Sequence, residues 1–392
     1  MTRYTTAACA IAVAALAAST SACSVTEAND TSAKSKGDGT INVESSAKNC
    51  DLTSSEAPSG NVVFKVKNTG SEVTEFYFYA ADGLRIVGEI ENVGPGLSRD
   101  LVVRAAPGTY LATCKPGMVG KGIRSKFTVT DSGTSTKITG VDQATIDAAT
   151  SQYAAYVRDQ SQQLVDETTK FAAAYKAGDD AEARTIFPHA RQYWERIETV
   201  AESFGDLDPK MDLREADLEP GQKWTGWHRI EKDLWPPASG YRAMTPAERA
   251  TAVDDLLANA KVLDQRVQGL KYTVDQIGNG SKGLLDEVAS GKITGEEDIW
   301  SHTDLYDFQA NVDGARVGFE GLKPLLEAKE PDLATQIETA FDNLQPLLDK
   351  YKKGSDDFVS YDKVTEAQRK ELSDAVNALA EPLSKMTGAI TL

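Results

Sequence analysis

The spacing of apolar residues changes near residue 140, and this change constrains the fold more than any other feature of the chain. Residues 39–131 contain short β-forming runs separated by turn signals such as Asp82-Gly83 and Pro107-Gly108. From residue 141 to 392, apolar side chains instead recur with a period near 3.6, which is typical of helices. The 392 residues also exceed what one ordinary core holds. The sequence therefore predicts a multi-domain protein, all-β in 39–131 and all-α in 141–392.

About seven strands in about ninety residues favour a Greek-key sandwich for the first part. The expected strands are Ile41–Glu44, Asn61–Lys67, Thr74–Tyr79, Arg85–Ile90, Leu101–Arg104, Tyr110–Cys114 and Ile123–Thr130.

The second part is predicted to be a helical bundle. Pro188, Pro246 and Pro331 are expected at helix starts, while Asn279-Gly280 and Lys353-Gly354 are expected to end helices. The expected helices cover 142–177, 188–204, 222–235, 246–278, 304–327, 331–352 and 364–386.

The N-terminus has the pattern of an export signal. Arg3 precedes an apolar run from Ala7 to Ala18 that is too short for a stable bilayer-spanning helix. Thr20-Ser21-Ala22-Cys23 looks like a lipobox, so we expect residues 1–22 to be removed and Cys23 to be lipidated; plain secretion is the alternative. The polar residues 23–38 then form a flexible linker. We expect an exported, membrane-anchored protein of the cell envelope, on the outer side of the cytoplasmic membrane or in the periplasm.

Two cysteines, Cys50 and Cys114, remain after export and lipidation. In an exported protein such a pair most often forms a disulfide. The alternative is a copper or iron site made of thiolate, Glu75 and Met118. Residues 39–131 contain no histidine, so a blue-copper centre, which needs two, is excluded there.

The negative charge is concentrated in the helical part. Residues 141–392 hold 46 acidic and 28 basic side chains, a balance of -18, whereas residues 39–130 hold nine acidic and ten basic side chains. Such a field repels nucleic acid and attracts cations. The alternative is an acidic surface that serves only solubility.

His228 and Glu231 form the motif that most specifically suggests a metal site. On a helix their spacing places both side chains on one face, one turn apart. Helical bundles build carboxylate-rich metal sites from such pairs. The alternatives are a surface ion pair and a hydrogen-bonded core histidine. A zinc peptidase is disfavoured, since Lys232 stands where the inverted zinc motif requires a second histidine.

Two further segments offer ligands. Glu195, Glu198 and Glu202 lie on one helical stripe, where a metal would offset their repulsion, although an exposed acidic face is the simpler interpretation. Asp304 suits a helix N-terminus, which leaves His302 unexplained unless its imidazole reaches the cavity of His228.

Taken together, these segments resemble the EfeO-type iron-uptake lipoproteins, which join a cupredoxin-like domain to an imelysin-like helical domain. The resemblance extends over nearly the whole mature chain. It is carried by Cys50, Glu75, Glu89 to Gly96 and Cys114 in the sandwich, and by Tyr193 to Glu198, Ser203 to Pro209, Asp212 to Glu215, Gly226 to Glu231, Ser301 to Leu305 and Ala310 to Ala315 in the bundle.

The resemblance implies an envelope-bound iron-binding component that delivers iron to a membrane permease, in a system that also includes a haem-dependent peroxidase. The family's His-x-x-Glu signature falls on His228 and Glu231. Matching segments and chemistry add Glu198, His302 and Asp304 as expected ligands. Nitrogen with hard oxygen ligands suits Fe²⁺ or Fe³⁺, and zinc, manganese or copper would also bind.

We therefore expect a binding protein rather than an enzyme. The rival functions are a copper-assisted ferroxidase and a metallopeptidase-like enzyme of the imelysin family. A polysaccharide or protein interaction module is a third, because a fold alone does not fix a function.

Overall fold

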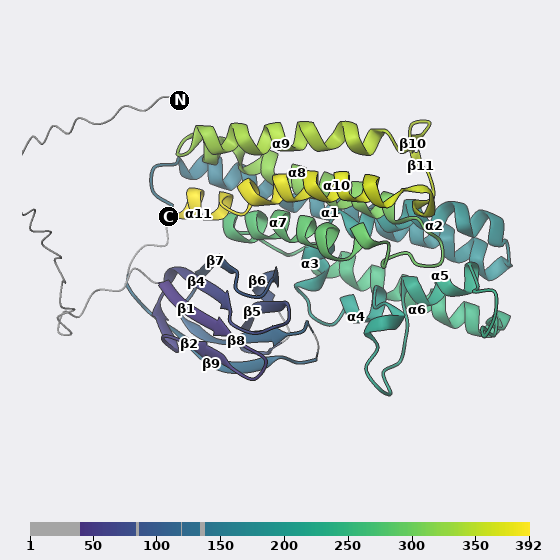
Figure 1. Cartoon of the computed structure of the whole chain (residues 1–392), viewed down its shortest axis with the longest axis horizontal. Helices are drawn as coiled ribbons and strands as arrows, with labels where there is room; N and C mark the ends of the chain where they lie inside the picture. Colours follow the sequence, from purple (N-terminus) through teal and green to yellow (C-terminus); the bar gives the residue numbers. More distant parts are fainter. Residues whose placement is uncertain (1–39, 84–85, 119, 134–137) are drawn as a thin grey trace, which may run out of the picture. The chain divides into compact units, whose positions relative to one another are not determined.

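A sandwich of two β-sheets forms the first folded part of the computed structural model, which describes residues 40–83, 86–118, 120–133 and 138–392 (Figure 1). One sheet has the strand order β2-β1-β4-β7 and the other β3-β9-β8-β5-β6. The strands are β1 (Thr40–Ser45), β2 (Cys50–Leu52), β3 (Glu56–Pro58), β4 (Gly60–Asn68), β5 (Thr74–Ala80), β6 (Ile86–Val93), β7 (Ser98–Ala105), β8 (Gly108–Pro116) and β9 (Ile123–Thr130).

Alternation of apolar and polar residues explains the sandwich core. Along β4, the side chains of Val62, Phe64 and Val66 are buried, whereas those of Lys65 and Lys67 are exposed. β4 pairs in parallel with β1 and antiparallel with β7. The seven predicted strands are present, although Arg85, the first residue of one prediction, lies outside the described residues. β2 and β3 were not predicted, because three residues are too few to show alternation.

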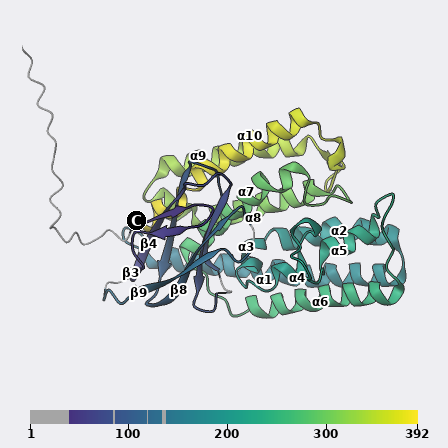
Figure 2. The same cartoon turned by 60° about the horizontal axis from the view of Figure 1, so that its bottom comes forward.

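Long helices lie side by side in the second part (Figures 1 and 2). α1 packs along α2 and α6, α8 packs along α7 and α9, and α10 packs along α9. The helices are α1 (Gln143–Ala177), α2 (Asp180–Glu195), α3 (Glu198–Glu202), α4 (Asp208–Met211), α5 (Trp227–Leu234), α6 (Pro246–Val267), α7 (Val274–Ser290), α8 (Asp304–Glu327), α9 (Pro331–Asp349), α10 (Glu366–Leu383) and α11 (Met386–Thr391). The predicted β-sandwich followed by a helical bundle is thus confirmed.

Several predicted helix boundaries are wrong. Pro188 lies inside α2, which begins eight residues earlier behind the N-cap Asp179. The predicted helix 188–204 is interrupted between α2 and α3, and 222–235 is helical only in α5. The prediction 246–278 fuses α6 with the start of α7.

Asn279-Gly280 does not end a helix, because α7 continues through it. Packing explains the glycine. A Cβ atom at Gly280 or Gly283 would lie 3.0 Å and 3.1 Å, respectively, from the side chain of Thr199 in α3. Glycine therefore allows α3 to approach α7 closely, at the expense of helix propensity.

The described residues from Thr40 to Leu392 form one compact unit, in which α7 contacts β6 and β7. Nδ2 of Asn279 donates to the carbonyl oxygen of Val102 at 2.9 Å, and a carboxylate oxygen of Asp275 accepts from the backbone N–H of Arg104 at 2.9 Å. The expected signal peptide, linker and lipidated Cys23 lie outside the described residues. No helix within the described ranges has the length and apolar character needed to cross a bilayer.

Candidate metal centre

The short helix α5 positions His228 in the interior of the helical part. Its apolar residues Trp227, Ile230 and Leu234 are buried in the core, and His228 itself is fully buried. Gly226, just before the helix, has a φ of 88°. A Cβ atom at Gly226 would overlap the backbone carbonyl of Met211. Glycine therefore lets the chain that carries Asp212 pass directly beside the start of α5.

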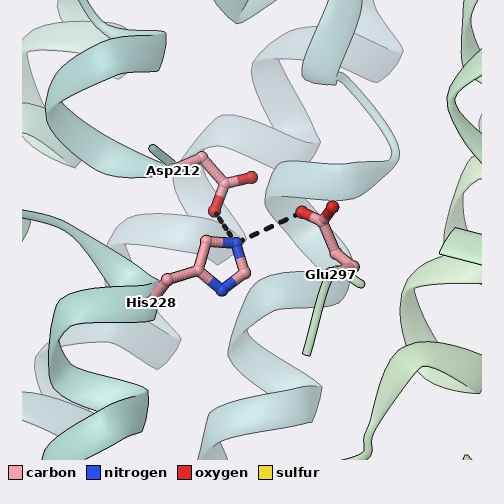
Figure 3. Close-up of side chains that lie close together, drawn as sticks. All are labelled: Asp212, His228 and Glu297. Atoms are coloured by element: carbon pink, nitrogen blue, oxygen red, sulfur yellow. Dashed lines mark hydrogen bonds and ion pairs between the residues drawn. The ribbon is translucent and has the colours of Figure 1, made fainter. Parts of the chain in front are cut away.

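Two carboxylates face Nε2 of His228. Nε2 lies 3.3 Å from Oδ1 of Asp212 and 3.2 Å from Oε1 of Glu297. Figure 3 shows the imidazole between these two carboxylates, which come from separate segments of the chain. All three side chains are buried, and their ligand atoms lie within 4.8 Å of one another. One nitrogen and two carboxylate oxygens at this spacing suit a divalent cation.

Glu231 lies on the opposite side of the imidazole. Its Oε2 is 3.1 Å from Nδ1 of His228. Its Oε1 accepts hydrogen bonds from the backbone N–H groups of Trp300 (3.1 Å) and Ser301 (2.8 Å), and from the Ser301 hydroxyl (2.9 Å). Asp298 is farther away, with Oδ1 3.8 Å from Nδ1. Glu231 therefore has hydrogen bonds to both of its oxygens.

The site belongs to a larger buried network of charges. Arg191 and Lys292 are both fully buried within it. Eight buried carboxylates surround these two cations and His228: Glu195, Glu198, Asp212, Glu231, Glu297, Asp298, Asp304 and Asp307.

Arg191 holds several of these carboxylates together. Its guanidinium contacts Glu195 and Asp212, and its Nε lies 3.3 Å from Oδ2 of Asp307. Nη2 lies 3.3 Å from Oε1 of Glu297. One planar cation thus anchors acids from α2, α8 and two connecting segments.

Negative charge in the network exceeds positive charge, and the pKa values respond to it. Burial raises the pKa of Asp298 and Asp307, and raises the pKa of Asp304 to about 7. Burial and Arg191 oppose protonation of His228, but Asp212, Glu231 and Glu297 raise its pKa well above the usual value. Burial also opposes ionisation of Glu297, yet Lys292 and His228 hold its pKa far below normal. The network therefore favours added positive charge, either as protons or as a metal ion.

The structure brings some predicted ligands together and separates others. Glu198 is buried, unlike the residues of an exposed acidic face, but its carboxylate contacts Lys292 rather than His228. Asp304 is also buried in the network, and its Oδ1 accepts from the backbone N–H of Asp298 at 3.2 Å. Oδ2 of Asp304 has no hydrogen-bond partner among the residues that the structure describes.

His302 does not belong to any group of potential ligands found among the described residues. It adopts a left-handed backbone conformation with a φ of 58°. Its backbone N–H donates to the carbonyl of Asp298, and its carbonyl accepts from Tyr361. Its backbone therefore helps shape the loop before α8, while its imidazole makes no described contact with His228.

Asp212 and Glu297 were missed by the analysis of motifs. Asp212 lies within one of the segments that carry the family resemblance, which was the available signal. Glu297 lies in the irregular connection between Thr294 and Asp304, where no periodicity marks a functional side chain.

In the sandwich, a disulfide joins Cys50 to Cys114. Neither sulfur is then a thiolate ligand, so the alternative copper or iron site lacks its central donor. Glu75 accepts a hydrogen bond from the hydroxyl of Tyr77 at 3.0 Å and lies 3.7 Å from Nζ of Lys115. Met118 is 42% exposed.

Comparisons with known proteins agree with this architecture. Residues 149–386 match the imelysin family, and residues 7–129 match the cupredoxin-like domain family. A protein of Staphylococcus haemolyticus strain JCSC1435 is 47% identical over 250 residues, which are 63% of this chain and 85% of the relative. A protein of Staphylococcus aureus strain MRSA252 is 45% identical over 258 residues, which are 65% of this chain and 89% of the relative. Both relatives are named as Efem/EfeO family lipoproteins. The chain therefore belongs to the Efem/EfeO family, with a cupredoxin-like sandwich followed by an imelysin domain.

Proposed function

We propose that this protein is the iron-binding component of an Efe-type uptake system, anchored to the cell envelope through Cys23. It captures iron in the helical domain and delivers it to a membrane permease, in a system that includes a haem-dependent peroxidase. The observation that carries the proposal is the buried group of His228, Asp212 and Glu297. The family relationship supports the role in uptake.

The ion is bound by Nε2 of His228 together with Asp212 and Glu297. Nδ1 then carries the hydrogen atom of the neutral ring and donates a hydrogen bond to Glu231. Metal-bound histidines usually donate their other N–H to a carboxylate or carbonyl in this way. The three donors to Oε1 of Glu231 support this assignment, since they fix the carboxylate in place. Glu231 is therefore a positioning residue in this proposal, rather than the ligand that the sequence motif suggested.

Transport rather than catalysis is favoured by the donor set and its surroundings. Imidazole and carboxylate oxygens bind Fe²⁺ or Fe³⁺ without the thiolates that hold a structural metal permanently. Binding also requires His228 to lose its proton in a network that favours protonation. A proton and the metal ion therefore compete for His228. This competition lowers the affinity for the metal, which suits its release to a permease.

Neither rival enzyme gains support from the arrangement. A copper-assisted ferroxidase would use the sandwich. There the disulfide leaves neither Cys50 nor Cys114 as a thiolate ligand, and residues 39–131 contain no histidine. A zinc peptidase with the inverted motif would need a second histidine where the chain has Lys232, whose ammonium instead contacts both carboxylate oxygens of the surface residue Glu215.

Anaerobic titration with Fe²⁺, monitored by isothermal calorimetry, tests the proposal. The parent should bind one ion, and His228→Ala should lower the affinity at least about 100-fold, since it removes a first ligand. His189→Ala is the matched control, because that imidazole is partly exposed and pairs with Asp357 at 3.2 Å. Equal iron binding by His228→Ala and the parent would refute the proposal.

A further inference from the structure

Lys292 is a fully buried cation whose role is not explained by a metal site at His228. Its Nζ lies 3.1 Å from Oε2 of Glu195. The two oxygens of Glu198 lie 3.3 Å and 3.1 Å from the same ammonium. Burying a lysine is costly unless strong partners compensate for its lost hydration. Two carboxylates provide that compensation.

The acids around Lys292 have the arrangement of a cation site. One oxygen from each of Glu195, Glu198 and Asp212 lies within 4.8 Å of the other two. Asp212 also belongs to the group around Nε2 of His228, so the same carboxylate joins two neighbouring cation positions. This is the relation found where a carboxylate bridges two metals in helical bundles.

Asn311 adds an independent sign that this position suits a cation. Its side chain is fully buried, and Nδ2 donates to the backbone carbonyl of Glu195 at 2.8 Å and lies 3.2 Å from carboxylate oxygens of both Glu195 and Glu198. Oδ1 of the same amide has no hydrogen-bond partner within the described part of the chain. Half a turn of the amide exchanges its oxygen and nitrogen. The turned amide would exchange its hydrogen bond to the backbone carbonyl of Glu195 for a contact between Oδ1 and a bound ion.

We infer that the ammonium of Lys292 occupies the place of a second metal ion and thereby limits the centre to one. This inference rests on the proposed function, because it concerns the stoichiometry of the same centre. Arg191 also pairs with Glu195, and the ammonium of Lys292 fills the space between Glu195 and Glu198. Its charge also opposes a cation at the neighbouring position and so favours release.

Replacing Lys292 by methionine tests the inference through the number of ions bound. Mn²⁺ serves as the probe because it prefers oxygen ligands. Native mass spectrometry and elemental analysis should find one Mn²⁺ in the parent and two in Lys292→Met. Lys282→Met is the matched control: Lys282 is a largely buried lysine of α7 that pairs with Asp286. The control should bind one ion.

A double variant shows where the second ion binds. Lys292→Met combined with Glu198→Gln removes one ligand of the new position and should return the count to one. A double variant that still binds two ions would overturn the assignment to Glu198.

Loss of folding in Lys292→Met would also be informative. If that chain folds only with Mn²⁺ present and then holds two ions, the metal has replaced the ammonium. A folded variant with one ion, or an unfolded variant that Mn²⁺ does not restore, would overturn the inference. A parent that binds neither Mn²⁺ nor Fe²⁺ would instead refute the proposed function.

Discussion

The sandwich has aromatic rings at its centre, whereas the helical domain has a network of charges at its centre. In the sandwich, the ring of Phe64 lies 5.0 Å from that of Phe76 and 4.9 Å from that of Phe78. In the helical domain, Arg191 and Lys292 are fully buried among carboxylates. Apolar burial stabilises the first arrangement. The second is tolerable only through mutual compensation of charge, which is typical of a functional site.

Of the changes proposed here to test the contrast between the two cores, removing Arg191 should have the largest effect on stability. Arg191→Met leaves several buried acids without their shared cation, and we expect a loss of about 5 kcal/mol in the free energy of unfolding. Arg242→Met is the control, because Arg242 is 70% exposed and pairs with Glu248; it should leave the free energy of unfolding nearly unchanged. Urea denaturation measures both. Similar losses in the two variants would contradict the special role of buried charge.

Removing the disulfide should destabilise the sandwich without affecting the metal centre. Cys50 and Cys114 are 64 residues apart, so their crosslink should contribute about 4 kcal/mol through the entropy of the unfolded chain. Chemical denaturation of the double serine variant measures the loss. Its Mn²⁺ stoichiometry should equal that of the parent; a lost ion would show that the sandwich supports the centre.

Glu231→Gln should weaken metal binding without abolishing it. The amide can satisfy either the N–H of His228 or the donors at Trp300 and Ser301, but not both, so the imidazole loses its fixed orientation. We expect an affinity for Mn²⁺ lower by about 10- to 100-fold.

The control for this variant is Glu215→Gln, which alters a partly exposed partner of Lys232. Calorimetric titration compares the two. Complete loss of binding in Glu231→Gln would make Glu231 a direct ligand, and unchanged binding would remove its positioning role.

The smallest effect should come from a surface ion pair of the helical domain. A hydrogen bond from Arg266 lowers the pKa of Asp206 to about 2. The ordinary value in an unfolded chain is about 3.9. The pair's contribution is therefore present above about pH 4 and is lost as pH falls towards 2.

Both side chains of this pair are about one third exposed, so solvent screening should keep the contribution under about 1 kcal/mol. Thermal melts of Asp206→Asn and the parent at pH 6 and pH 3 measure it. Their difference should shrink at the lower pH. A difference that grows on acidification would contradict the assigned direction of the pKa shift.

The sequence predicts elements well where local chemistry decides them. Pro246 and Pro331 stand at the first positions of α6 and α9, where proline suits a helix. The same rule fails at Pro188, since the capping residue Asp179 starts α2 earlier. At Gly280, close packing against Thr199 replaces the local preference to end the helix.

For the centre, His228 and Glu231 were found because they lie one turn apart on α5. Asp212 and Glu297 were not found. Their approach to His228 depends on how the chain folds beside Gly226 and after Thr294. No periodic pattern records such an approach.

A crystal grown with Fe²⁺ and measured on both sides of the iron absorption edge would test the central claim most directly. The account predicts one anomalous peak in the helical domain, bonded to Nε2 of His228 and to carboxylate oxygens of Asp212 and Glu297. A peak on the Nδ1 side between Glu231 and Asp298, or one away from His228, would contradict it.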